Sequence, residues 1–289
     1  MTEGGRAGVR LDSWKVPVGL ALWVFILYAN TLGNNFHYDD THSLIDNTSV
    51  RSLGNVGRFF LDPGSFSAMP DARMYRPLLL VTYAVNYAID GYDAFGYHLF
   101  NVLLHAANAC LVWHVARRVL GGHGTALTAA LLFATHPVVS ESVNYVSSRS
   151  TSLAALFVLG AVIALVDGSR RPSWRHHAAL TVLVAAALLS KSVGVVLLPA
   201  AALWLWLLGP GTRASWTLLV GPAVAAGAYV MGTRVIVGKA LFEPVRTLGI
   251  QVATQLKAIP FYAYTNLMPA HLSVEPQFFE APGVLGLVP

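Results

Sequence analysis

The chain has 289 residues, of which 55% are hydrophobic and only 11% are charged, and its mean hydropathy is +0.56. Because ordinary soluble domains carry roughly 25% charged residues, this composition excludes a typical soluble enzyme and predicts a protein that crosses the membrane several times. The single cysteine, Cys110, excludes a disulfide framework. The net charge of +5 has to be interpreted from where the basic residues lie.

Apolar runs predict an all-α, polytopic bundle of about seven spans. The runs are 16–32, 97–116, 125–139, 150–167, 178–190, 193–208 and 214–232. The first run follows Arg6, Arg10 and Lys15, as in a secretory signal, but no small-residue cleavage site follows it. We therefore interpret it as a retained span.

The charges between the runs predict the orientation. The N-terminus and every second loop after it hold nine basic and three acidic residues, whereas the other side holds 10 basic and 11 acidic residues. Cytoplasmic loops carry the basic excess, so we expect residues 1–15 to be cytoplasmic and the loop after the first span to face outward. This distribution accounts for the positive charge, and we expect no nucleic-acid partner.

The first outer loop, roughly 33–96, is long and partly amphipathic. We expect 49–61 and 77–89 each to form a helix lying in the membrane interface, with Pro77 in the first turn of the second. Residues 249–267 are predicted to form another juxtamembrane helix on the outer side. We take 16–275 as one membrane domain and 276–289 as a truncated tail.

Two adjacent acids, Asp39 and Asp40, directly follow the first span. Acids at a membrane boundary repel each other and lose hydration, so their position indicates a function. One interpretation is a general base that faces a lipid-borne substrate. The alternative is that either acid caps a short interfacial helix through its backbone N–H groups. Adjacent side chains diverge, so one acid can cap while the other points into a cavity.

The second run carries a polar stripe. His98, Asn101, His105 and Asn108 share one helix face, which must contact protein or a wet cavity. We favour interhelical hydrogen bonding over direct substrate contact. We expect no metal site, because the two histidines lie two turns apart and the stripe has no carboxylate or cysteine.

The second outer loop contains three ionisable groups, His136, Glu141 and Arg149. Either Glu141 and Arg149 pair with each other, or the planar guanidinium of Arg149 binds a phosphate. Lys191 lies between the fifth and sixth runs with no acid near it in sequence. It either extends harmlessly to the membrane surface or neutralises a lipid phosphate.

Several short motifs occur in a fixed order. They are Phe36-His37-Tyr38-Asp39-Asp40, Ile45-x-Asn47, Tyr75-Arg76-Pro77-Leu78, Tyr97-His98-x-x-Asn101-x-x-x-His105, His136-Pro137-x-x-x-Glu141 and Ser148-Arg149. Over roughly 16–275 the ordered set resembles the membrane portion of the transmembrane and tetratricopeptide-repeat O-mannosyltransferases and their bacterial relatives, which belong to the GT-C class.

The resemblance implies a polyprenyl- or dolichyl-phosphate-linked sugar as donor, usually mannose, an acceptor hydroxyl on the outer face and no obligatory metal or other cofactor. It places the base on Asp39 or Asp40. Where the family usually has Lys-Glu, this chain has Lys191-Ser192, which puts the role of an acid there in doubt. The expected donor-phosphate ligands are Arg76, Arg149 and Lys191. The expected cavity-lining residues are His37, His98, Asn101, His105, His136 and Glu141.

We therefore expect an inverting glycosyltransferase that moves a sugar, usually mannose, from a lipid phosphate to a hydroxyl acceptor, above all protein Ser/Thr. The alternative is a non-catalytic membrane protein: a transporter, a lipid- or partner-binding module, or an inactive truncated homologue. Family members continue with more spans and a repeat domain, so we expect a fragment, a truncated homologue or a half that needs a partner. The Arg-rich, Lys-poor usage favours a bacterial cell membrane over the endoplasmic reticulum.

Overall fold

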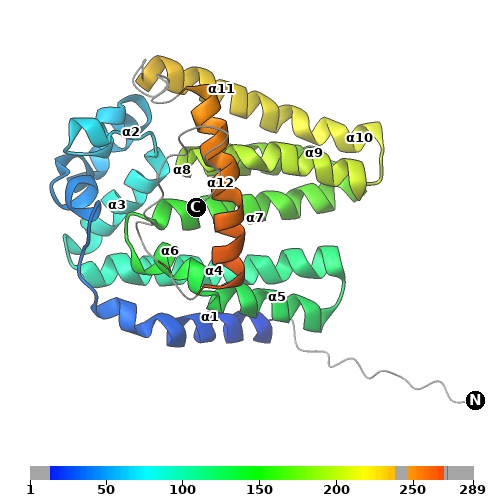
Figure 1. Cartoon of the computed structure of the whole chain (residues 1–289), viewed down its shortest axis with the longest axis horizontal. Coiled ribbons are helices and arrows are strands. Elements are labelled where there is room, and N and C mark those ends of the chain that lie inside the picture. The colour runs from blue at the N-terminus through cyan, green and yellow to red at the C-terminus, as the bar shows by residue number, and fades with distance from the viewer. Residues whose placement is uncertain (1–13, 238–246, 270–271, 273–289) are drawn as a thin grey trace, which may run out of the picture.

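The helices lie side by side in one bundle, as Figure 1 shows. The computed structural model describes residues 14–237, 247–269 and 272, and this part of the chain is helical without any strand, so the all-α prediction is confirmed. The tail predicted at 276–289 and most of the N-terminal segment 1–15 lie outside the described residues. The longer helices are α1 (Lys15–Tyr28), α3 (Pro77–Asp90), α4 (Ala94–Leu120), α5 (His123–Thr135), α7 (Arg149–Arg170), α8 (Trp174–Ser190), α9 (Leu197–Leu207), α11 (Val220–Val237) and α12 (Leu248–Leu267). The shorter ones are α2 (Val56–Leu61), α6 (Ser140–Asn144) and α10 (Arg213–Trp216).

Several helices can cross a membrane, which supports a multi-pass protein. Four stretches are long and apolar enough among the described residues: Lys15–Gly33, Ala94–Leu120, Arg149–Arg170 and Arg213–Val235. A fifth consists of α5 and the following Pro137–Asn144, bent by 52° at a proline, which cannot continue a helix. The predicted count of seven is not confirmed, because α8 and Ser192–Leu207 are shorter than the roughly 20 residues that a span needs.

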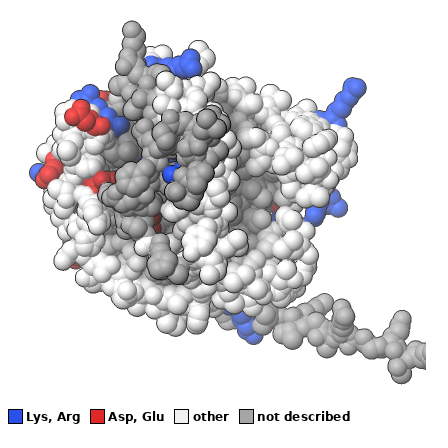
Figure 2. Space-filling view, viewed as in Figure 1, with Lys and Arg blue, Asp and Glu red and all other residues white. Residues whose placement is uncertain are grey.

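The bundle has two different ends. α2 and α3 gather at the left in Figure 1, whereas the connections from α4 to α5 and from α9 to α10 lie at the right. On the face shown in Figure 2, the carboxylates appear mainly at the left end and the right end shows Lys and Arg. This polarity matches the charge pattern of the loops. The cytoplasmic position of the N-terminus remains a prediction.

The helices that are predicted to lie beside the membrane agree only in part with expectation in their bounds. α3 begins with Pro77, as predicted, and α12 covers the predicted 249–267 and crosses the front of the bundle (Figure 1). The single helix expected over 49–61 is wrong, because two 3-10 turns precede α2. The side chains of Asn47 and Ser52 accept hydrogen bonds from the backbone N–H groups of Ser49 and Gly54 and so start each turn anew.

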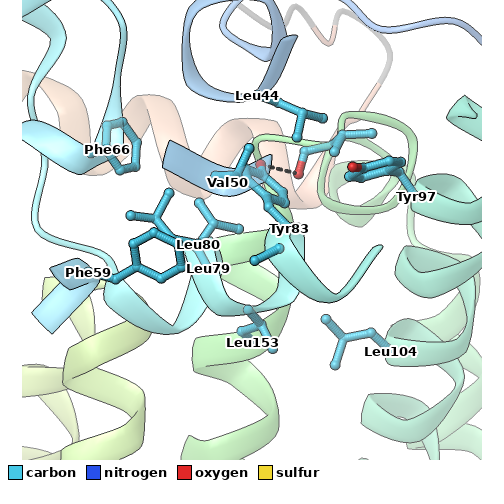
Figure 3. Close-up of a cluster of buried hydrophobic side chains, with 12 residues drawn as sticks. Leu44, Val50, Phe59, Phe66, Leu79, Leu80, Tyr83, Tyr97, Leu104 and Leu153 are labelled. Atoms are coloured by element: carbon cyan, nitrogen blue, oxygen red, sulfur yellow. Dashed lines mark hydrogen bonds between the residues drawn. The ribbon is translucent and has the colours of Figure 1, made fainter. Parts of the chain in front are cut away.

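A buried apolar cluster holds the loop between α1 and α4, which is predicted to face outward, against the bundle (Figure 3). Leu44 and Val50 come from the loop, and they pack with side chains of α2, α3, α4 and α7, including Phe59, Leu79, Leu80, Tyr97, Leu104 and Leu153. Within the cluster, the Tyr83 hydroxyl donates to the carbonyl oxygen of Val146 at 3.2 Å. The segment that carries the two acids is therefore fixed on the helices by burial of apolar surface.

Candidate functional site

Asp40, the second of the adjacent acids, is a buried structural group. Its side chain is 1% exposed. Oδ1 accepts hydrogen bonds from the backbone N–H and the hydroxyl of Ser147 at 2.8 and 2.6 Å, and Oδ2 accepts from the backbone N–H of His37 at 3.0 Å. Burial raises the pKa of Asp40, and these hydrogen bonds only partly offset it. Asp40 precedes the π-helix Thr41–Ile45 without making a side-chain capping bond, so the capping alternative is wrong for this residue.

Asp39, by contrast, points outward. Its side chain is 59% exposed, and Oδ1 lies 3.4 Å from Nε2 of His42. Nδ1 of His42 in turn lies 2.9 Å from the Ser67 hydroxyl, and the backbone N–H of Asp39 donates to the Tyr145 hydroxyl at 2.9 Å. The carboxylate is thus held from one side and remains accessible from the other.

Asp39 lines a cavity of about 330 Å³, which we call the polar cavity. Its ionisable and hydroxyl lining includes Asp39, His42, Arg76, Glu141, Tyr145 and Lys191. Arg76 lies just before α3 and Lys191 just after α8, so segments far apart in sequence bring two cations to the same cavity as the acid. The Arg76 guanidinium donates to Ser150 Oγ at 3.1 Å, and Lys191 Nζ donates to Thr151 Oγ1 at 2.8 Å.

Burial affects both cations of the polar cavity. It lowers the pKa of Arg76, and it also lowers the pKa of Lys191, which the positive charge of Arg76 depresses further. Two cations that share a partly desolvated cavity favour the binding of an anion, because an anion offsets both their mutual repulsion and their lost hydration. A phosphate is such an anion.

Arg149 lies elsewhere, in the interior. Its side chain is 0% exposed and lines neither of the two cavities described here. Nε donates to Asn101 Oδ1 at 2.7 Å, Nη1 to Asn86 Oδ1 at 2.7 Å and Nη2 to the carbonyl oxygen of Tyr97 at 2.9 Å. The guanidinium carbon lies 4.4 Å from the ring centroid of Phe100, a cation–π distance. The expected pairing with Glu141 is not formed, and the structure does not bring Arg149 to the polar cavity.

The polar stripe of α4 is buried, as the sequence indicates. His98, Asn101, His105 and Asn108 are at most 2% exposed, and none of them lines either cavity. Asn101 Nδ2 donates to Val143 O at 3.2 Å, Asn108 Nδ2 donates to Ser152 O at 2.9 Å, and His105 Nε2 lies 3.2 Å from Ala134 O. Three residues of the stripe therefore join α4 to neighbouring segments. This geometry agrees with interhelical hydrogen bonding rather than substrate contact.

The remaining predicted residues lie around the loops that are predicted to face outward. His136 Nε2 lies 3.0 Å from Asn266 O and so links the end of α5 to α12. Glu141 accepts a hydrogen bond from the Ser148 hydroxyl at 3.0 Å and lines the polar cavity. Among the described residues, no group of three or more His, Cys, Asp or Glu side chains is arranged to hold a metal ion.

A second cavity, of about 620 Å³, adjoins the first, and we call it the apolar cavity. Its walls include Pro137, Val138, Phe261, Tyr262 and Leu272, together with the polar side chains Asn34, His37, Ser140, Asn144, Thr265 and Asn266. Tyr38, Glu141 and Tyr145 line both cavities.

Tyr38 and Tyr145 stand edge to face, with ring centroids 6.2 Å apart, where the two cavities meet. Tyr38 has a φ of +46°, a left-handed conformation that costs a non-glycine residue roughly 1–2 kcal/mol. Backbone strain of this kind collects at functional sites. Here it occurs in the residue immediately before Asp39.

The chain was compared with known proteins. Residues 76–241, more than half of the chain, match the family model described as dolichyl-phosphate-mannose-protein mannosyltransferase. The chain belongs to this family. Within the matched range lie Arg76, Glu141, Arg149 and Lys191, whereas Asp39 and Asp40 precede it.

Individual members of the family are also similar to the chain. Protein O-mannosyl-transferase Tmtc2 of Drosophila melanogaster is 34% identical over 196 residues, which cover 62% of this chain and 20% of that protein. Tmtc1 of the same fly is 32% identical over 189 residues, covering 62% and 21%, and TMTC3 of Homo sapiens is 29% identical over 196 residues, covering 65% and 21%. The resemblance to the transmembrane and tetratricopeptide-repeat O-mannosyltransferases is confirmed. The chain spans about a fifth of the length of these relatives. No solved structure matches it.

Some site residues were missed in the sequence. Four residues near the adjacent acids were not predicted. His42 and Tyr145 contact Asp39, and Ser147 donates to Asp40. Ser67 lies within hydrogen-bonding distance of His42. Tyr145 and Ser147 lie more than 100 positions from the acids that they contact, and helical or strand periodicity relates only residues that are close in sequence. The one available signal was the polar run Ser147-Ser148 before α7.

Proposed function

We propose that the polar cavity transfers mannose from a polyprenyl- or dolichyl-phosphate donor to the hydroxyl of a protein Ser or Thr on the outer face of the membrane. One observation supports this proposal above the others: Asp39, Arg76 and Lys191 line the same cavity of about 330 Å³. The arrangement offers a base for the acceptor and two cations for the leaving phosphate. Membership of the mannosyltransferase family supports the choice of sugar.

Asp39, rather than Asp40, is the proposed general base. An acceptor hydroxyl is a weak nucleophile, and a positioned carboxylate that takes its proton typically contributes about 10²–10⁴-fold. Asp39 is accessible, whereas both carboxylate oxygens of Asp40 already accept hydrogen bonds from the protein. In the transfer step the acceptor oxygen bonds to the anomeric carbon, its proton passes to Asp39, and the bond to the phosphate oxygen breaks. A single displacement inverts the configuration.

Arg76 and Lys191 are the proposed ligands of the donor phosphate. The phosphate gains negative charge as the glycosidic bond breaks, and fixed cations stabilise that charge in the transition state. Arg149 is not included in this set, because its nitrogens already donate to groups inside the protein. Its proposed role is to hold the α7 N-terminus against α3 and α4.

The test is a transfer assay with the full chain in membranes, with radiolabelled polyprenyl-phosphate mannose and a Ser/Thr-rich peptide. We expect transfer by the wild type with inversion at the anomeric carbon, and a loss of at least about 100-fold in Asp39→Asn. Asp71→Asn, an exposed acid of the same loop that lines neither cavity, is the matched control and keeps its rate. Donor binding by the wild type without any turnover would contradict the proposal and favour the non-catalytic alternative.

A further inference from the structure

The apolar cavity has no role in the transfer step described above, yet it adjoins the polar cavity. The consecutive residues His37, Tyr38 and Asp39 pass from one to the other: His37 lines the apolar cavity, Tyr38 lines both, and Asp39 lines the polar cavity. Consecutive Cα atoms are about 3.8 Å apart, so a group in the apolar cavity beside Tyr38 lies close to the proposed base.

We propose that the apolar cavity binds the acceptor polypeptide next to the Ser or Thr that is modified. The inference rests on the proposed function, since it assigns the second substrate of the same site. The hydroxyl would reach Asp39 past the edge of the Tyr38 and Tyr145 rings, while the flanking residues occupy the apolar cavity.

The lining fits a polypeptide better than the hydrocarbon chain of the donor. Pro137, Val138 and Phe261 offer apolar and aromatic contact for side chains. Asn34, Asn144 and Asn266 add side-chain amides, which match the N–H and C=O groups of an extended backbone. Asn144 Oδ1 already accepts a hydrogen bond from the Thr31 hydroxyl, and Asn266 Nδ2 already donates to Tyr262 O. A hydrocarbon chain would bury the remaining amide groups of these side chains without giving them a partner, which is unfavourable.

The charges of the two cavities support the same assignment, with the peptide in the apolar cavity and the donor phosphate in the polar cavity. Among the described residues, the lining of the apolar cavity contains the acid Glu141 and no Lys or Arg, whereas Arg76 and Lys191 both line the polar cavity. The phosphate of the donor therefore favours the polar cavity. The apolar cavity favours acceptor segments that are neutral or basic, because acidic residues there would face Glu141.

The apolar cavity exists only where α12 packs against other segments of the folded chain. α12 crosses the front of the molecule (Figure 1). Its C-terminal half supplies one wall of the cavity through Phe261, Tyr262, Thr265 and Asn266. The contact of 3.0 Å between His136 Nε2 and Asn266 O fixes that wall to the end of α5. The cavity is thus enclosed by segments more than 100 residues apart in the chain.

The first experiment fills the cavity with Val138→Trp. We expect the KM for a Thr-containing peptide to rise by about tenfold or more, with the KM for the donor changed by less than about twofold. Leu132→Trp is the matched control, because Leu132 is 62% exposed on α5 and lines neither cavity. The assay is repeated with donors of short and long isoprenoid chains. If Val138→Trp instead changes the dependence on isoprenoid length and leaves the peptide KM unaltered, the cavity holds lipid and the inference is overturned.

A second experiment varies the peptide. With wild-type protein, residues beside the acceptor Thr are changed to Leu, Lys or Asp, and we expect the Asp peptide to have a kcat/KM lower by about tenfold, a penalty that Glu141→Gln reduces. Equal use of the Asp and Lys peptides would contradict the inference.

A third experiment uses wild-type protein and does not measure activity, so it tests the inference even if a variant fails to fold. A peptide with a photoreactive residue beside the Thr should cross-link to α12 near Tyr262 in the wild type. Cross-linking of a photoreactive isoprenoid at that position, with no peptide cross-link, would overturn the assignment. If the wild type does not transfer mannose at all, the proposed function fails, and the peptide cross-link then decides by itself whether the cavity binds polypeptide.

Discussion

Two regions of the molecule use the same kinds of residue for different purposes. The interior network consists of two hydrogen-bonded sets, Asp40 with Ser147 and Arg149 with Asn101 and Asn86. The polar cavity contains Asp39, His42, Arg76 and Lys191. In the network, the acid and the arginine are buried and their polar atoms are bonded to protein groups. In the cavity, the acid is 59% exposed, and the two cations are half-buried, line the cavity and each donate a hydrogen bond to a hydroxyl of α7. Burial and existing hydrogen bonds, rather than residue type, therefore separate structural charges from those able to act on a substrate.

The largest effect is expected from a substitution that disrupts the interior network. Arg149→Ala removes hydrogen bonds to Asn101, Asn86 and Tyr97 and leaves a void, so we expect the free energy of unfolding to fall by about 3–5 kcal/mol. The thermal midpoint in detergent, followed by tryptophan fluorescence, measures the loss. Arg58→Ala is the control, because Arg58 is 62% exposed beside Asp62 and its pair contributes at most about 1 kcal/mol. Equal midpoints for the two variants would show that Arg149 is not structural.

Asp40→Ala should have the second largest effect. It leaves the N–H groups of His37 and Ser147 and the Ser147 hydroxyl without their acceptor, which should cost about 2–4 kcal/mol of unfolding free energy. Because burial raises the pKa of Asp40 in the folded protein, protonation favours folding. The wild-type advantage is therefore complete below the ordinary Asp pKa of about 3.9 and declines as the pH rises through the higher folded pKa.

Thermal midpoints of the wild type and of Asp40→Ala, compared from about pH 4 upward, test this sign. A difference that grows with pH would contradict the raised pKa of Asp40 in the folded protein.

Within the polar cavity, Lys191→Met should lower kcat/KM for the donor by about 10- to 100-fold, because one cation of the phosphate site is lost. The pKa of Lys191 is lowered by burial and by Arg76, so its positive charge disappears at a lower pH than for an ordinary lysine. The donor kcat/KM of the wild type should fall early at alkaline pH, and Lys191→Arg should move that fall upward, since a guanidinium stays charged. An unchanged alkaline limb in Lys191→Arg would remove Lys191 from the site.

The smallest expected effect concerns His42, which orients Asp39. His42→Gln keeps a donor near Asp39 but loses the ring geometry fixed by Ser67, so kcat should fall only about three- to tenfold, with the peptide KM unaltered. Ser67→Ala should produce the same change in milder form. A loss as large as that of Asp39→Asn would indicate that His42 itself acts on the substrate.

The all-helical membrane architecture could be predicted from the sequence, because long apolar runs and prolines determine where helices form and end within their own segment of the chain. The sequence also indicated the buried stripe of α4, since helical periodicity places His98, Asn101 and His105 on one face. It did not separate Asp39 from Asp40, because their difference depends on Ser147, more than 100 residues away. Arg149 was expected at a phosphate for the same reason: its partners Asn86 and Asn101 lie on other helices, and only the packing of α3, α4 and α7 shows that its nitrogens are already occupied.

The most direct measurement is the single-turnover rate of mannose transfer at saturating donor, in Asp39→Asn and in the wild type. If Asp39 is the base, Asp39→Asn should bind the donor with wild-type affinity, keep its thermal midpoint and transfer at least about 100-fold more slowly. A transfer rate within about threefold of the wild type would contradict the assignment of Asp39.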